Sequence, residues 1–239
     1  MSAFGGPNIV DNGLVLYLDA GNRKSYPGSG TTWSDKSGFN NNGTLINGPT
    51  FNTGSGGSIV FDGVNDYVLC SPLSSFINPN DGITLNYFVK TSNTSRRNLL
   101  VSNYSYVNPY PGITGELGTV GGLWQNGLRW QVIGNGRIDI YVNNVIQDNI
   151  VYFVTFTFDF TSKSAKIYLN GVELVPIVRS LSSSITTAWL QNVNLEIAAD
   201  AGNSLFYLGN IYTTSIYNRA LTAQEVLQNY NATKGRFGL

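Results

Sequence analysis

The chain has 239 residues, of which 12% are charged and 42% are hydrophobic. Fourteen basic residues balance fourteen acidic ones, and no more than two basic residues are adjacent. This charge pattern offers no basic surface for nucleic acid. The apolar runs are far shorter than the ~20 residues of a membrane-spanning helix, and the first residues lack the basic start and apolar core of a secretion signal. We therefore expect no nucleic-acid binding, no membrane insertion and folding in a cytoplasm.

Two residue counts exclude several kinds of active site. The chain contains no histidine, which removes the Ser-His-Asp and Cys-His arrangements and imidazole metal sites. Its one cysteine, Cys70, cannot form an intrachain disulfide and lies in the apolar segment DYVLC. We expect Cys70 to be a buried, unreactive side chain.

Strands separated by turns are predicted from the start of the chain. The first four cover residues 13–19, 58–61, 66–70 and 83–90. In the fourth, Ile83, Leu85, Tyr87 and Val89 alternate with more polar residues and are expected to share one buried face.

A run of antiparallel strands is predicted for residues 118–150. The pairs Asn126-Gly127, Gly134-Asn135 and Asn143-Asn144 recur about every nine residues and are typical of turns in such a run. The next segment, residues 151–160, is bulky and apolar on one face and partly so on the other. Such a strand belongs near the centre of a sheet.

The last quarter of the chain predicts a hairpin, two further strands and one helix. Asn170-Gly171 joins strands at 164–170 and 172–178 by a tight turn, and more strands are expected at 193–199 and 204–217. Thr222 and Glu225 have the spacing of a capping box, which predicts a helix from there to about Tyr230. The segments 1–12 and 231–239 are expected to be an N-terminal arm and a C-terminal tail without elements of their own.

Five segments carry a family resemblance across residues 13–230. They are GLVLYLDAGN, WSDKSGFNNNG, SIVFDGVNDYV, YLNGVEL and GNIYTTSIYNRALTAQEVLQNY, and in this order the chain resembles the laminin-G-like branch of the concanavalin A-like lectins and glucanases. The resemblance implies one all-β domain, a concanavalin A-like jelly-roll sandwich of two antiparallel sheets with one short C-terminal helix.

No catalytic residues are expected. The E-x-D-x-x-E pattern that jelly-roll hydrolases use is absent. Glu196 and Asp200 share one face of a predicted strand, but four residues at ~3.3 Å each separate their backbones by about 13 Å. That separation exceeds what a glycosidase pair tolerates unless the strand bends.

Calcium is the one cofactor that the sequence leaves open. Asp62, Asn65 and Asp66 place three oxygen-bearing side chains in one turn, and calcium prefers such ligands. Calcium at a rim loop is also what the family resemblance implies. The alternative is that these side chains only accept hydrogen bonds from their own turn.

A tyrosine-rich loop is the candidate contact surface. Tyr104, Tyr106 and Tyr110 lie close together in the segment 103–112, which also holds two prolines. Rigid amphipathic rings suit a protein contact or sugar stacking, with subunit packing favoured, and they equally suit a loop that lies down on its own domain.

The segments GLVLYLDAGNRKSYPGSGTTW and SIYNRALTAQEVLQNYNATKGRF also look like laminin-G-like domains in structural proteins of tailed phages. This resemblance implies a non-enzymatic virion protein that decorates the capsid or forms part of the tail, neck or fibre. Its expected partners are copies of itself, other virion proteins and a cell-surface glycan. A free carbohydrate-binding module is the alternative, and a glycoside hydrolase is a further one.

Overall fold

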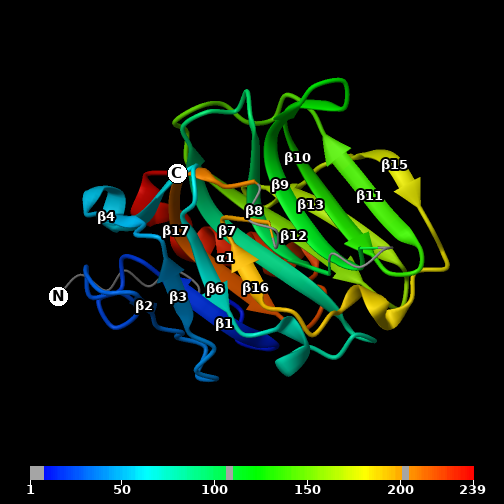
Figure 1. The fold of residues 1–239 in the computed structure, drawn as a ribbon, viewed down its shortest axis with the longest axis horizontal. Helices are drawn as coiled ribbons and strands as arrows, with labels where there is room; N and C mark the ends of the chain where they lie inside the picture. The colour runs from blue at the N-terminus through cyan, green and yellow to red at the C-terminus, as the bar shows by residue number, and fades with distance from the viewer. Residues whose placement is uncertain (1–7, 106–109, 201–204) are drawn as a thin grey trace.

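The computed structural model describes residues 8–105, 110–200 and 205–239. They form two antiparallel sheets packed face to face, as the sequence predicts, with one α-helix near the C-terminus (Figure 1). No helix in these ranges is long and apolar enough to cross a membrane.

The first sheet has eight strands and follows the order β14-β13-β12-β7-β17-β5-β4, with β1 also paired to β17. In the middle of this sheet, β7 pairs with β12 on one side and with β17 on the other, each over eight residue pairs. β12 is the segment that the sequence predicts near the centre of a sheet. The strands are β1 (Leu14–Asp19), β4 (Thr50–Asn52), β5 (Ser58–Asp62), β7 (Gly82–Thr91), β12 (Tyr152–Asp159), β13 (Ser164–Leu169), β14 (Val172–Glu173) and β17 (Leu208–Tyr217).

The second sheet has nine strands in the order β15-β11-β10-β9-β8-β16-β6-β3-β2. Its middle is a run of consecutive hairpins from β8 to β11. The strands are β2 (Thr32–Trp33), β3 (Gly43–Ile46), β6 (Tyr67–Cys70), β8 (Arg97–Tyr104), β9 (Gly112–Val120), β10 (Trp124–Ile133), β11 (Arg137–Val142), β15 (Ile177–Leu181) and β16 (Leu195–Ile197).

The main core lies between the two sheets. Trp130 of β10 is fully buried, stacks on Phe156 of β12 with ring centroids 5.3 Å apart, and donates a hydrogen bond from Nε1 to the Thr157 carbonyl at 3.0 Å. This contact ties the two sheets together, because a buried indole N–H needs an acceptor. Cys70 is buried in the same core, as expected.

A second apolar cluster lies on the other face of the eight-stranded sheet, under helix α1 (Ala223–Thr233). Val226 of the helix packs there with Phe88 of β7 and Phe153 of β12. The capping box is confirmed: the Thr222 side chain accepts from the Glu225 amide, and the Glu225 carboxylate accepts from the Thr222 amide.

The two ends of the described chain are more ordered than the sequence predicts. The helix runs to Thr233 instead of ending near Tyr230, and the 3₁₀ turn η4 (Lys234–Phe237) follows it. Phe237 stacks on Phe88 with ring centroids 4.4 Å apart. Near the other end, the Val10 amide donates to the Asn229 side chain at 2.8 Å. Residues 231–239 therefore contain the end of the helix and a 3₁₀ turn instead of an element-free tail, whereas residues 8–12 hold no helix or strand and pack on the domain.

The strand expected at residues 172–178 is two strands in different sheets. β14 ends at Glu173, and the chain crosses at Pro176 to β15, which pairs with β11. The proline interrupts the ladder because it has no N–H to donate. The hairpin turn itself is confirmed, since Asn170 and Gly171 adopt φ values of 52° and 80°.

One of the three predicted turns in the central region is wrong. Asn126-Gly127 lies inside β10, where the register to β9 shifts and Asn126 has a φ of 42°. This is a β-bulge, and the chain reverses instead at residues 121–123. The sequence analysis also did not predict the strands at 97–104 and 112–117, which form β8 and the first part of β9, or the short strands β2, β3 and β4.

The three short 3₁₀ turns that complete the described structure are η1 (Gly54–Gly56), η2 (Leu73–Ser75) and η3 (Thr187–Trp189).

Candidate functional site

The outer face of the nine-stranded sheet carries buried charged residues. Along β10, Leu128, Trp130 and Val132 belong to the core, so Arg129 and Gln131 point to the opposite face. Arg129 is nevertheless only 5% exposed, and its cross-strand neighbour Glu116 is fully buried. Burial of this kind is costly unless the charges are paired.

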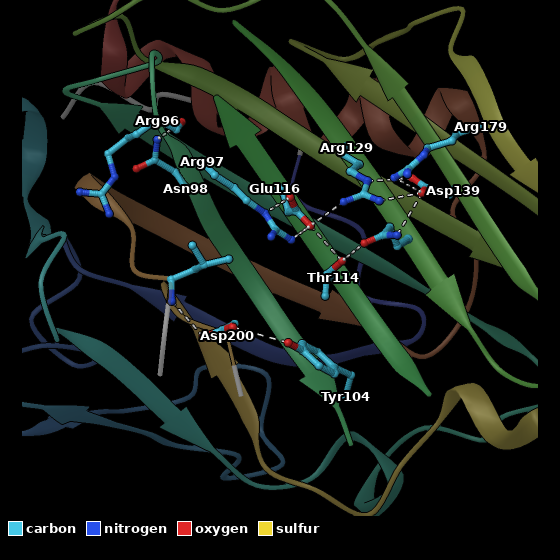
Figure 2. Close-up of polar contacts among 12 residues, drawn as sticks. Arg96, Arg97, Asn98, Tyr104, Thr114, Glu116, Arg129, Asp139, Arg179 and Asp200 are labelled. Carbon is cyan, nitrogen blue, oxygen red and sulfur yellow. Dashed lines mark hydrogen bonds and ion pairs between the residues drawn. The ribbon is translucent and has the colours of Figure 1, made fainter. Parts of the chain in front are cut away.

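The buried charges form a continuous chain of ion pairs across β8, β9, β10 and β11 (Figure 2). Arg97 donates from Nε and Nη2 to the two carboxylate oxygens of Glu116, at 2.6 and 2.7 Å. Arg129 contacts Asp139 in the same two-pronged way, at 2.8 and 2.6 Å, and reaches Glu116 with Nη1 at 3.4 Å. Arg179 of β15 adds a longer contact to Asp139 at 3.5 Å.

Neutral side chains complete this network. Gln131 donates from Nε2 to Asp139 at 3.1 Å, and the Thr114 hydroxyl donates to the Gln131 carbonyl oxygen at 3.0 Å. Each buried carboxylate therefore has at least two cationic partners. Carboxylates held in this way are suited to fixing the position of arginines, and they do not resemble the separated acid and base of a hydrolase.

A cavity of about 340 Å³ lies over the network. This volume falls within the range of small-ligand sites. Its lining combines charged, polar, apolar and aromatic side chains, namely Arg97, Leu99, Tyr104, Tyr110, Thr114, Arg129, Gln131, Ile133, Arg137, Arg179 and Asp200.

Two of the three tyrosines singled out in the sequence line this cavity. Tyr104 donates to Asp200 at 3.5 Å, and Tyr110 is 49% exposed (Figure 2 shows Tyr104 and Asp200). Tyr110 also has a φ of 59°, which is rare for a bulky side chain and is found where surrounding structure holds a residue in place. Tyr106 lies outside the described residues.

The sequence did not identify the arginine and carboxylate network. Glu116 and Arg129 are 13 residues apart and Arg129 and Asp139 are 10 apart. Only the strand register brings them together. The available signal was the placement of single charges at outward positions of otherwise apolar strands.

The sequence predicts that Glu196 and Asp200 share one extended strand, but β16 ends at Ile197, before Asp200. Ala198 has a φ of 72°, so the chain bends after β16 and the 13 Å extended separation does not apply. Burial and, to a lesser extent, the charge of Asp200 together raise the pKa of Glu196 to about 7. Within the described residues the Glu196 Oε2 atom has no hydrogen-bond partner. Asp200 instead accepts from the Leu205 amide at 3.0 Å.

The loop proposed for calcium shows the contacts of a capped turn. Asp62 Oδ1 accepts from the amides of Val64 and Asn65, at 2.8 and 3.3 Å, and Asp66 Oδ2 accepts from the Asp62 amide at 3.1 Å. In the part of the chain that the structure describes, no group of three His, Cys, Asp or Glu side chains could hold a metal. Calcium binding by Asp62, Asn65 and Asp66 stays a prediction.

Several solved structures that share this fold are binding domains of toxins. The binding domain of Paraclostridial Mosquitocidal Protein 1 matches with a TM-score of 0.68 and 19% identity, over 93% of this chain and 52% of that one. The botulinum neurotoxin serotype D ligand-binding domain in complex with N-acetylneuraminic acid matches with a TM-score of 0.64 and 13% identity, over 94% and 52%. The binding domain of botulinum neurotoxin DC in complex with rat synaptotagmin II gives 0.65 and 14%, over 93% and 52%.

This chain therefore spans about half the length of these structures, and at such identities the likeness establishes the fold alone. No curated protein matches the sequence. The family model described as the concanavalin A-like lectin/glucanases superfamily, of the laminin-G-like type, matches residues 62–227. With more than half of its length matched and the two-sheet sandwich in place, the chain belongs to the laminin-G-like family of concanavalin A-like lectin and glucanase domains.

Proposed function

We propose that the chain is a non-enzymatic structural protein of a tailed-phage virion, as a capsid decoration or a tail, neck or fibre component. It acts through contacts with copies of itself and with other virion proteins. The resemblance of two long segments to phage structural proteins supports the virion assignment. The observation that carries the contact function is the open, apolar edge strand β15.

β15 lies at the outer edge of the nine-stranded sheet, where it pairs only with β11 in the described structure (Figure 1). Ile177, Val178 and Leu181 are 48%, 54% and 65% exposed, and Val175 just before them is 93% exposed. Soluble proteins usually protect such edges with charges or bulges, because an open strand recruits another strand, and β15 has one register shift, at Arg179. The segment Leu174–Leu181 carries a single charge, Arg179.

The proposed occupant of this edge is the same strand of a second copy. Two identical antiparallel strands can pair across a two-fold axis and close, so neither copy leaves an open edge. Because each strand carries only Arg179 as a charge, pairing two copies brings few like charges together. Many such weak contacts gain strength when they repeat over a symmetric particle.

Replacing Val178 by lysine is expected to abolish self-association. Sedimentation velocity of the purified full chain should show a concentration-dependent dimer, and Val178→Lys should remain monomeric because its charge would be desolvated in the pairing. Val64→Lys is the matched control, since Val64 is 68% exposed in the loop before β6, and it should dimerise like the native chain. A native chain that stays monomeric at high concentration would contradict the edge pairing.

The virion assignment has its own test. Quantitative mass spectrometry of purified particles should find this chain at a fixed number of copies per particle after washing. Finding it only in the fraction free of particles would rule out a structural role.

Glycan adhesion is a second candidate function, and the cavity over the arginine network favours it. Two of the structural neighbours, each about twice as long as this chain, are described in complex with N-acetylneuraminic acid and with rat synaptotagmin II. Glycoside hydrolysis is the weakest candidate, because the two buried carboxylates of the network are each neutralised by arginines.

A further inference from the structure

The cavity is built to attract negative charge. Four arginines line it, and Asp200 is the one acidic residue among its described lining residues. The carboxylates of Glu116 and Asp139 lie beneath it and are almost fully buried. They neutralise part of the arginine charge and hold the guanidinium groups in place.

Two of the four arginines are already committed to this network. Arg97 and Arg129 each make two short contacts to a carboxylate. Arg179 makes one longer contact to Asp139, at 3.5 Å, and its side chain is 43% exposed. Arg137 is exposed and has no ion pair within the described residues. Arg137 and Arg179 therefore have donors free for an anionic ligand.

The rest of the lining indicates that the anion is part of a larger, ring-shaped molecule. Tyr110 presents a half-exposed ring, while the apolar side chains of Leu99 and Ile133, 0% and 8% exposed, form part of the cavity wall. Gln131 and Thr114 place amide and hydroxyl groups nearby. Aromatic faces beside a few fixed polar groups suit a sugar ring, which has an apolar face and a hydroxylated edge.

We propose that the cavity binds an acidic saccharide, with its carboxylate held by Arg137 and Arg179 and its ring packed on Tyr110. This inference rests on the proposed glycan adhesion and adds the chemical class of the glycan. A guanidinium group matches a carboxylate with two parallel hydrogen bonds, which makes arginine more selective for this group than lysine.

A panel of matched saccharides tests the proposal. Trigalacturonate, a hyaluronan tetrasaccharide and 3′-sialyllactose are each compared with their methyl esters, which keep the ring and remove the charge. Calorimetry with the full chain should show saturable binding of at least one acid and binding of its ester weaker by roughly tenfold or more. Inorganic sulfate at the same ionic strength separates specific recognition from general attraction of anions.

Variants identify the residues. Arg137→Met and Arg179→Met should each weaken binding of the acid roughly tenfold and leave the affinity for the ester unchanged. Tyr110→Asn should weaken both ligands, since asparagine tolerates the positive φ but lacks the ring. Arg23→Met, outside this cavity, is the matched control. Because Arg179 also contacts Asp139, thermal melts check its folding, and Arg137→Met tests the proposal without that contact.

The outcomes are distinguishable. Equal binding of acid and ester would overturn the acidic class and still support glycan adhesion. If sulfate binds as tightly as the acidic sugars and displaces them, the cavity is a general anion site, and recognition of the sugar ring is overturned. Absence of binding across the panel would overturn the inference and the glycan function together, and it would leave the virion assignment to the particle experiment.

Discussion

Arg129→Met is expected to lower the free energy of unfolding by about 3 kcal/mol, the low end of the cost of breaking a buried ion pair. Glu116 and Asp139 would lose a shared partner while remaining buried at 0% and 1% exposure. The loss stays at the low end because Arg97 still contacts Glu116, and Gln131 still contacts Asp139. For a domain of this size the melting temperature should fall by about 6–12 °C.

Two further variants make this result specific to the buried charges. Lys166→Met removes an ion pair to Glu173 in which both side chains are more than 40% exposed, and it should cost under about 1 kcal/mol. Adding Glu116→Gln and Asp139→Asn to Arg129→Met removes the unpaired charges and should recover part of the lost stability. If Arg129→Met and Lys166→Met destabilise the chain equally, the buried ion pairs of Arg129 are no more important for stability than an exposed ion pair, which contradicts the prediction.

Glu196→Gln is expected to stabilise the chain at pH 8 and to have little effect near pH 4. Burial raises the pKa of Glu196 in the folded chain to about 7, against 4.5 for the exposed group. Below pH 4.5 the carboxyl is protonated in both the folded and unfolded states, so glutamine is a close mimic. Between pH 4.5 and about 7 the unfolded chain releases this proton while the folded chain keeps it, so stability falls over this window and levels off once both states are ionised.

Thermal melts across this pH window measure the effect. The gain at pH 8 should be about 1–2 kcal/mol, below the full value for such a pKa difference because the side chain retains some exposure, at 7%. This corresponds to about 2–8 °C in melting temperature. Glu173→Gln, at an exposed position, should show no comparable gain. A Glu196→Gln gain that is the same at pH 4 and pH 8 would contradict the raised pKa.

The parts of the fold that sequence predicted are those set by local chemistry. Ile83, Leu85, Tyr87 and Val89 do share the buried face of β7, because a period of two leaves one face apolar. The Asn170-Gly171 turn and the capping box at Thr222 depend on residues next to one another in the chain. Each of these patterns is confirmed in the structure.

The parts that sequence missed depend on strand register and on crossings between sheets. Residues 172–178 look like one apolar strand, and only the pairing of β15 with β11 shows that the chain changes sheet at Pro176. Likewise, Glu116, Arg129 and Asp139 belong to three strands, and no local motif links them. Tyr104 and Tyr110 were identified from composition, but their cavity could not be predicted.

Under the proposed function, this domain binds saccharides without cleaving them. The most direct test is mass spectrometry of the acidic saccharide panel after long incubation with the full chain, at concentrations where binding is saturated. We expect every saccharide to be recovered at its original mass. Shortened products that disappear in Glu196→Gln or Asp200→Asn would contradict the claim and identify those two carboxyl groups as a catalytic pair.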